Sequence, residues 1–161
     1  MKNHGGIAFV LTCAACATIH GIATAADTQI ALKDLPAPVL AMVATNSTGA
    51  EIAKVVKQGD RGNVSYLIEF DRDGHKFWDT FSPDGKLTMT QERIPFSQVS
   101  TAASAAIHRR AGDVQIKDVT RTMKAGTESY TATIPKDGKT FAVTVDQNGA
   151  ILGDKEVPAA Q

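Results

Sequence analysis

Few side chains in this 161-residue chain could carry chemistry, and their spacing matches no catalytic or metal-binding motif. His75 and His108 lie far apart in sequence, and no H-E-x-x-H pattern is present to place two histidines on one helix face. No serine lies in a G-x-S-x-G context, and no glycine-rich phosphate-binding loop is found. We therefore predict that the protein is not an enzyme and has no cofactor, no metal and no catalytic residue.

Two polar clusters have simpler structural explanations. Asp71-Arg72-Asp73-Gly74 resembles the beginning of a calcium loop, but it lacks the further oxygen ligands and the distal bidentate carboxylate that such a loop needs. A β-hairpin turn explains its aspartates and glycine without an ion. His108-Arg109-Arg110 is expected at the end of a helix, where cations complement the helix dipole.

The first 25 residues are typical of a secretory signal peptide. Lys2 is followed by an apolar stretch, and Ala23-Thr24-Ala25 offers the small residues of a cleavage site, which predicts cleavage after Ala25 or Ala26. The stretch is too interrupted for a membrane span. Both cysteines, Cys13 and Cys16, lie inside this segment, so lipid anchoring at Cys16 is an alternative. We expect a periplasmic or secreted protein with no stable membrane insertion after cleavage.

The charge balance excludes one class of partner. The chain has 17 Lys and Arg against 17 Asp and Glu, whereas binding to nucleic acid requires a clustered basic surface. We therefore predict no nucleic-acid partner.

The remaining chain repeats itself once. Residues 30–91 align with residues 94–155 without a gap, and the identical positions include turn glycines and apolar residues such as Tyr66 with Tyr130 and Phe77 with Phe141. We predict an α+β fold made of two tandem repeats, each one helix followed by a four-stranded antiparallel sheet. The first unit covers residues 27–91 and the second residues 92–157.

The helices and strands of each unit follow from the spacing of apolar residues. Apolar stripes at every fourth position predict two helices, formed by Leu35, Val39 and Val43 in the first unit and by Val99, Ala103 and Ile107 in the second. Asp34 and Ser97 are candidate N-caps. Alternation with period two then predicts strands near residues 51–58, 63–71, 75–82 and 86–91 of the first unit.

The two units differ most in their third strand. Phe77, Asp79 and Phe81 take the core-facing phase, so Trp78 is expected on the opposite, open face of the sheet. A large aromatic side chain on an open face can anchor a protein interface. The alternatives are that Trp78 packs between the units or that a β-bulge shifts the phase. The candidate partner contacts on the open face are Trp78, Lys76, Thr80, Thr140 and Thr144.

The pattern of turns and core positions resembles a known family. Leu35-Pro36-Ala37-Pro38-Val39, the segments 49–55, 65–70 and 73–77, and their counterparts in segments 129–130 and 141–149 are similar to PepSY-like proteins. These are exported bacterial modules related in fold to beta-lactamase inhibitory protein. The resemblance implies a tandem fold without a cofactor, in a protein that restrains a peptidase or another hydrolase. No position matches the loop residues that such inhibitors insert into an active site.

We therefore predict an exported protein-binding module that uses its open sheet faces, with a periplasmic peptidase or another hydrolase as the suspected partner. The alternative is a small-ligand-binding or envelope-sensing protein with a cleft between the two units, which requires a mainly apolar pocket. A third hypothesis, a hydrolase, requires a titratable pair within hydrogen-bonding reach in a cleft.

Overall fold

The structure, a computed structural model, describes residues 27–59 and 62–158. The predicted signal peptide, Cys13 and Cys16 lie outside these residues.

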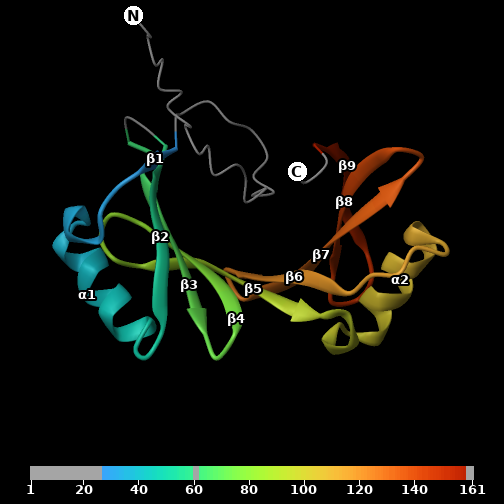
Figure 1. The fold of residues 1–161 in the computed structure, drawn as a ribbon, viewed down its shortest axis with the longest axis horizontal. Coiled ribbons are helices and arrows are strands. Elements are labelled where there is room, and N and C mark those ends of the chain that lie inside the picture. The colour runs from blue at the N-terminus through green and yellow to red at the C-terminus, as the bar shows by residue number, and fades with distance from the viewer. Residues whose placement is uncertain (1–26, 60–61, 159–161) are drawn as a thin grey trace, which may run out of the picture.

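The described chain forms one antiparallel sheet of nine strands whose spatial order follows the sequence. The strands are β1 (Thr28–Gln29), β2 (Glu51–Gln58), β3 (Ser65–Arg72), β4 (His75–Phe81), β5 (Leu87–Pro95), β6 (Asp118–Lys124), β7 (Thr127–Lys136), β8 (Lys139–Asp146) and β9 (Ile151–Val157). In Figure 1 the sheet bends in its middle, and its two ends rise on the same side.

The predicted fold class, two repeats that each have a four-stranded sheet, is wrong. Strand β5 pairs with β4 on one side and with β6 on the other, and Ile94 lies opposite Val119 across the second pairing. This pairing satisfies backbone groups that would otherwise lie unpaired at two exposed sheet edges. Alternation of apolar residues identifies a strand but does not identify its neighbour across a long connection, so the sequence pattern did not reveal the continuous sheet.

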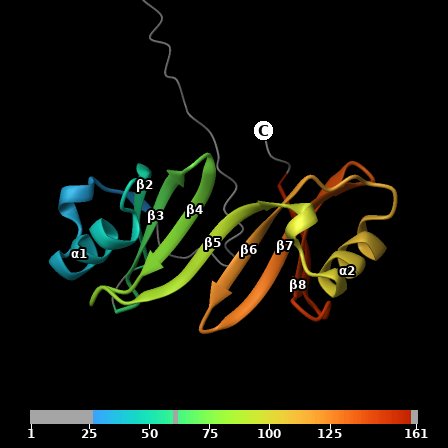
Figure 2. The same cartoon turned by 90° about the horizontal axis from the view of Figure 1, so that it is seen from below.

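Two helices, α1 (Ala37–Asn46) and α2 (Thr101–Ala111), cover the outer side of the bent sheet near its two ends (Figures 1 and 2). They leave the middle strands, β5 and β6, without a helix above them (Figure 2). Each helix lies over its own hydrophobic cluster. The central strands nevertheless contribute Ile94 and Val119 to the cluster under α2.

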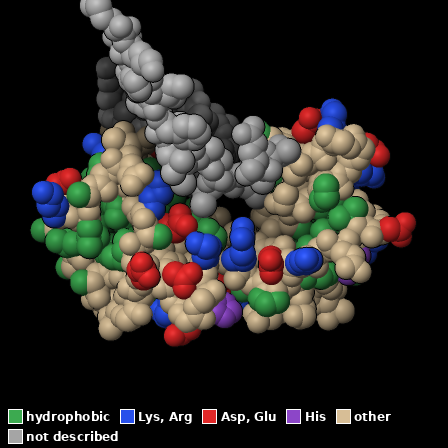
Figure 3. Space-filling view, viewed as in Figure 1, with side chains coloured by type: hydrophobic (Ala, Val, Ile, Leu, Met, Phe, Trp, Pro, Cys, Tyr) green, Lys and Arg blue, Asp and Glu red, His purple; other side chains and the backbone are tan. Residues whose placement is uncertain are grey.

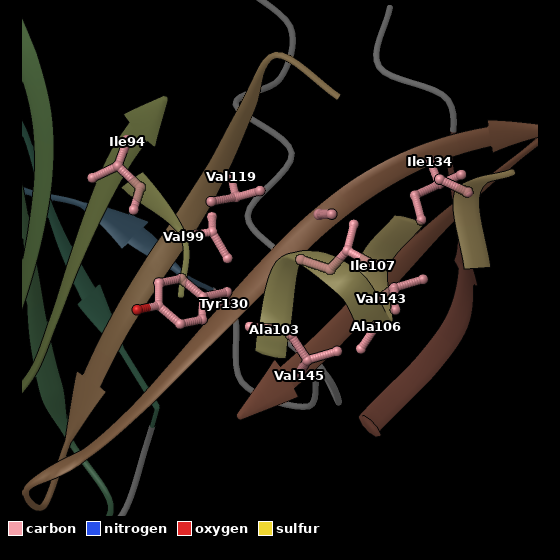
Figure 4. Packing of buried hydrophobic residues seen from close by; sticks show 12 residues of the cluster. Ile94, Val99, Ala103, Ala106, Ile107, Val119, Tyr130, Ile134, Val143 and Val145 are labelled. Carbon is pink, nitrogen blue, oxygen red and sulfur yellow. The ribbon is translucent and has the colours of Figure 1, made fainter. Parts of the chain in front are cut away.

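The apolar stripes predicted for the helices are confirmed in part. All six residues are buried: Leu35, Val39, Val43, Val99, Ala103 and Ile107. However, Leu35 and Val99 lie just before the helices, at the ends of the preceding 3₁₀ turns. Figure 4 shows Ala103, Ala106 and Ile107 of α2 facing Val143 and Val145 of β8. Full burial of an aliphatic side chain of this size stabilises a fold by about 1.5–3 kcal/mol. Packing of the two stripes is thus a main contribution to stability.

The predicted helix caps are wrong. The N-cap of α2 is Ser100, whose side-chain oxygen accepts a hydrogen bond from the backbone nitrogen of Ala103 at 3.3 Å. The helix begins after the short 3₁₀ turn Phe96–Gln98, so Ser97 lies too early to cap it. Asp34 likewise lies in a 3₁₀ turn, Leu32–Asp34, and Pro36 precedes the first residue of α1.

The segment that resembled a calcium loop is the turn between β3 and β4. Asp73 and Gly74 both have positive φ angles, 53° and 77°, as a two-residue hairpin turn of type I′ requires. The Asp71 carboxylate accepts a hydrogen bond from the backbone nitrogen of Gly74 at 3.1 Å. The carboxylate therefore stabilises the turn.

Candidate functional site

The face of the sheet away from the helices, which we call the open face, carries the candidate residues. Its side chains on strands β3–β8 include Leu67, Glu69, Asp71, Lys76, Trp78, Thr80, Met89, Gln91, Arg93, Thr120, Thr122, Lys124, Thr127, Ser129, Thr131, Thr133, Thr140, Ala142 and Thr144, as the strand registers show. Hydroxyl and amide groups predominate on this face. Acidic and basic side chains are mixed in the visible middle of the molecule (Figure 3).

Trp78 lies near the centre of the first half of the open face and is partly buried. Glu69 of β3 and Gln91 of β5 lie opposite it on the two neighbouring strands. Glu69 is 8% exposed, and one of its carboxylate oxygens lies 3.7 Å from the ammonium group of Lys76. The indole is therefore bordered by an ion pair on one side and by an amide on the other.

A row of polar side chains continues from Trp78 into the second half of the sheet. Gln91 lies opposite Thr122, with its Nε2 atom 3.4 Å from the threonine hydroxyl. In the next row, the hydroxyls of Thr131 and Thr144 share a hydrogen bond of 2.9 Å. A row of polar side chains therefore crosses the open face from Glu69 on β3, past Trp78, to Ser129 on β7.

The structure brings only some of the candidate residues together. Lys76, Trp78 and Thr80 follow one another on β4, whereas Thr140 and Thr144 lie on β8. Four strand spacings separate β4 from β8, on the order of 20 Å. Thr80 is only 7% exposed, so it offers little surface, while Lys76 is largely exposed. A partner that contacts both groups must span the middle of the sheet.

Asp79, next to Trp78, faces the opposite side of the sheet, as the alternation predicts. It is only 5% exposed and lies on the side of the hydrophobic cluster that contains Ile68 and Phe81. Burial raises the pKa of the Asp79 carboxyl, and the Thr90 hydroxyl and the Arg72 charge oppose this rise only in part. Its Oδ1 atom has no hydrogen-bond partner among the described residues.

Arg72 borders this cluster on β3. Its guanidinium lies over the stacked rings of Phe70 and Phe77, at 5.4 and 5.7 Å from their centroids, and donates to the backbone oxygen of Asn46 at the end of α1. Its Nε atom is buried without a partner among the described residues. Arg72 therefore fastens α1 to the sheet and places a positive charge near Asp79.

A shallow hollow of about 300 Å³ lies where the β3–β4 turn approaches β5 and the start of β6. Its side chains are mostly charged, including Asp71, Lys76, Arg93 and Asp118. The small-ligand alternative required a mainly apolar pocket with a few polar groups. The hollow does not have this character.

The two histidines occupy separate places and lack a catalytic arrangement. His75 Nδ1 lies 3.9 Å from a carboxylate oxygen of Glu92, and the His108 ring packs edge-on against Phe96 with centroids 4.9 Å apart. Within residues 27–59 and 62–158, neither histidine hydrogen bonds to a serine, and no three His, Cys, Asp or Glu residues could hold a metal ion. None of the helices in this part of the chain is long and apolar enough to cross a membrane.

The open face also has an apolar part that was not among the predicted site residues. Val56, Leu67 and Met89 lie in one row with Thr80, and Val56 and Leu67 are 6% and 5% exposed. The available signal was that Val56 and Leu67 are apolar in the phase expected for polar residues. The Trp78 region is therefore flanked by apolar side chains as well as by polar ones.

Solved structures share this architecture. No protein-family model and no curated protein matches the chain. A protein of Bacteroides eggerthii that is provisionally described as periplasmic aligns with a TM-score of 0.65 and 17% identity over 78% of this chain and 91% of its own. A DUF2874 family protein of Bacteroides ovatus gives 0.63 and 16% over 76% and 88%. A BLIP-like protein of Bacteroides fragilis gives 0.59 and 16% over 77% and 87%.

The bent antiparallel sheet with helices on its outer side therefore places the protein in the class of BLIP-like folds. At 16–17% identity the similarity establishes a shared fold and no more. The location expected from the leader agrees with the description of the B. eggerthii protein. The closer resemblance to PepSY modules stays a prediction.

Proposed function

We propose that the protein is an exported, non-enzymatic binding module that holds another protein against its open face. The observation that carries this proposal is Trp78, the only tryptophan of the chain, which lies partly exposed among polar side chains on a face that neither helix covers. Tryptophan side chains that are surrounded by polar groups are frequent hot spots of protein interfaces.

The shape of the surface supports a protein partner. The sheet bends so that the open face lies on its inner side, and such a surface fits a protruding loop or edge of a folded protein (Figure 1). The hollow between the β3–β4 turn and β5 is lined mostly by charged side chains, which does not favour an apolar small ligand there. The BLIP-like neighbour supports protein binding in general. The partner class that the sequence resemblance implies, and that we propose here, is a periplasmic peptidase or another hydrolase.

Affinity capture from a periplasmic extract, with Trp78→Ala as a parallel bait, tests the proposal. A partner retained by the native protein and lost by the variant is then purified and titrated calorimetrically. We expect Trp78→Ala to weaken this binding by more than about 1 kcal/mol, because the variant removes the aromatic anchor.

Met123→Ala is the matched control, since Met123 is a large exposed apolar residue of the other face. It should leave the affinity unchanged. Unchanged affinity of Trp78→Ala together with reduced stability would show that Trp78 is an internal packing residue, and the proposal would fail.

A further inference from the structure

Asp79 occupies a buried position whose counterpart in the other half of the sheet is an apolar residue. On β8, at the equivalent place under α2, stands Val143, which is 0% exposed. Asp79 is almost equally buried, and its Oδ1 atom has no hydrogen-bond partner among the described residues. A buried carboxylate with an unsatisfied oxygen destabilises a fold, so packing alone does not account for an acid at this position.

The surroundings of Asp79 compensate its negative charge only in part. Thr90 lies opposite it on β5 and Ile68 on β3, while Arg72 is the charged group that acts on it. Glu92, two residues further along β5, is engaged by Arg121 and lies near His75. Helix α1, with the sequence APVLAMVATN, carries no titratable side chain. No second cation among these groups acts on Asp79.

Strand β4 connects this carboxyl directly to the open face. Asp79 lies between Trp78 and Thr80, and successive side chains of a strand point to opposite faces. Any change in how tightly β4 lies against the hydrophobic cluster therefore moves Trp78 on the other side. Thr80 is itself buried, and its hydroxyl has no hydrogen-bond partner among the described residues. Two consecutive residues of β4 therefore each bury a polar atom without a partner.

We propose that Asp79 is a pH-sensitive group that couples acidification to the open face: its protonation tightens β4 against the cluster and orders Trp78 for binding. Only the consequence for binding rests on the proposed function; the response of Trp78 does not. The neutral carboxyl has no charge to hydrate, so the closed arrangement of β4 becomes more favourable when the proton binds.

The direction of the response follows from burial. Because burial raises the pKa of Asp79 in the folded protein, the folded state retains this proton at pH values where an unfolded or locally opened chain has lost it. The closed state of β4 is therefore favoured as the pH falls through this window. Ionisation of Asp79 above the window favours local opening of β4.

The single tryptophan makes this response measurable without a partner. Fluorescence excited at the indole reports on Trp78 alone, because no other tryptophan is present. We expect the emission of the native protein to titrate with a midpoint above pH about 3.9, the ordinary value for aspartate. Hydrogen exchange of β4 amides, corrected for intrinsic rates, should show protection that rises up to about tenfold per pH unit as the pH falls through the same window.

Two variants of Asp79 and one control identify the titrating group. Asp79→Asn and Asp79→Val should both abolish the fluorescence transition. Glu69→Gln is the control, because Glu69 is the other carboxylate next to Trp78 and lies opposite it on the open face. This variant should retain the transition of the native protein.

The proposal is overturned if the native emission does not titrate, if the transition persists in Asp79→Asn, or if Glu69→Gln removes it. Protection of the β4 amides that stays constant through the window would also overturn it. A failure of this kind leaves the partner experiment with Trp78→Ala unaffected, so the two proposals are separately testable.

Discussion

Replacement of the buried carboxyl by the residue of the equivalent strand should stabilise the protein. Asp79→Val places on β4 the side chain that β8 carries at Val143, which is 0% exposed. We expect the free energy of unfolding at pH 7 to increase by about 1–2 kcal/mol. Replacement of buried ionic groups by apolar residues of similar volume is often neutral or stabilising, because the cost of removing a charge from water is then absent.

The magnitude follows from the contacts of Asp79. Burial of the valine contributes about 1.5 kcal/mol. Removal of the unpartnered Oδ1 atom contributes about 1–3 kcal/mol. The loss of the Thr90 and Arg72 interactions costs about 1–2 kcal/mol together. These contributions sum to a net gain between about 0.5 and 3.5 kcal/mol. The expected gain of about 1–2 kcal/mol lies in the lower half of this range and corresponds to a rise in Tm of roughly 3–8 °C for a chain of this size.

The gain should depend on pH with a definite sign. The pKa of Asp79 is raised in the folded state, so below the ordinary aspartate pKa the carboxyl is neutral in both states and its penalty is absent. As the pH rises through the folded-state pKa, the native protein loses stability that Asp79→Val retains. Urea denaturation followed by far-UV circular dichroism at pH 3.5 and pH 7 measures both values, with equal m-values as the test of two-state behaviour.

The reciprocal variant, Val143→Asp, is the control. It buries a carboxylate opposite Asp154 of β9, a second acid, and should destabilise the protein by about 3 kcal/mol or more. A loss of stability of more than about 1 kcal/mol in Asp79→Val at pH 7 would refute the reasoning. The reasoning would also be refuted if the difference in free energy of unfolding between Asp79→Val and the native protein were the same at both pH values.

Two further substitutions test the turn and the cap that hold the helices. Gly85→Ala should destabilise the protein by about 1–3 kcal/mol, because Gly85 has a φ angle of 86° and an added Cβ would lie 2.7 Å from the backbone oxygen of Pro38. Thermal unfolding measures this loss. Gly153→Ala is the control and should be tolerated, since its Cβ would lie 4.0 Å from the nearest atom. Ser100→Ala should cost about 1 kcal/mol in urea denaturation by removing the cap of α2, whereas Ser97→Ala should change little; equal losses in the two serine variants would contradict the cap assignment.

Local elements were largely predictable from the sequence. The alternation of Tyr66, Ile68 and Phe70 identified β3, and the Asp73-Gly74 dipeptide identified the turn that follows it. These patterns depend on neighbours along the chain, whose spacing is set by the geometry of a strand or a turn. The predicted N-cap of α2 was wrong because Ser97 and Ser100 are equally suitable residues. Only the 3₁₀ turn between β5 and α2 decides which of them caps the helix.

The candidate site was predictable only in part. The phase of β4 alone indicated that Asp79 faces the core, and its 5% exposure confirms this. The same phase assigned Thr80 to the open face but could not show that the residue is buried, because its burial depends on Leu67 and Met89 of the neighbouring strands. The role of Trp78 in partner contact stays a prediction.

The sequence by itself determined the strands, the hairpin turns, the apolar stripes of the two helices and the unusual acid at position 79. Each of these features depends only on residues that lie a few positions apart in the chain. Only the tertiary structure decided that β5 joins β6, so that the strands form one bent sheet with a single continuous open face. The physical reason is that backbone groups at a strand edge pair with any compatible edge, and side-chain alternation does not encode which edge that is.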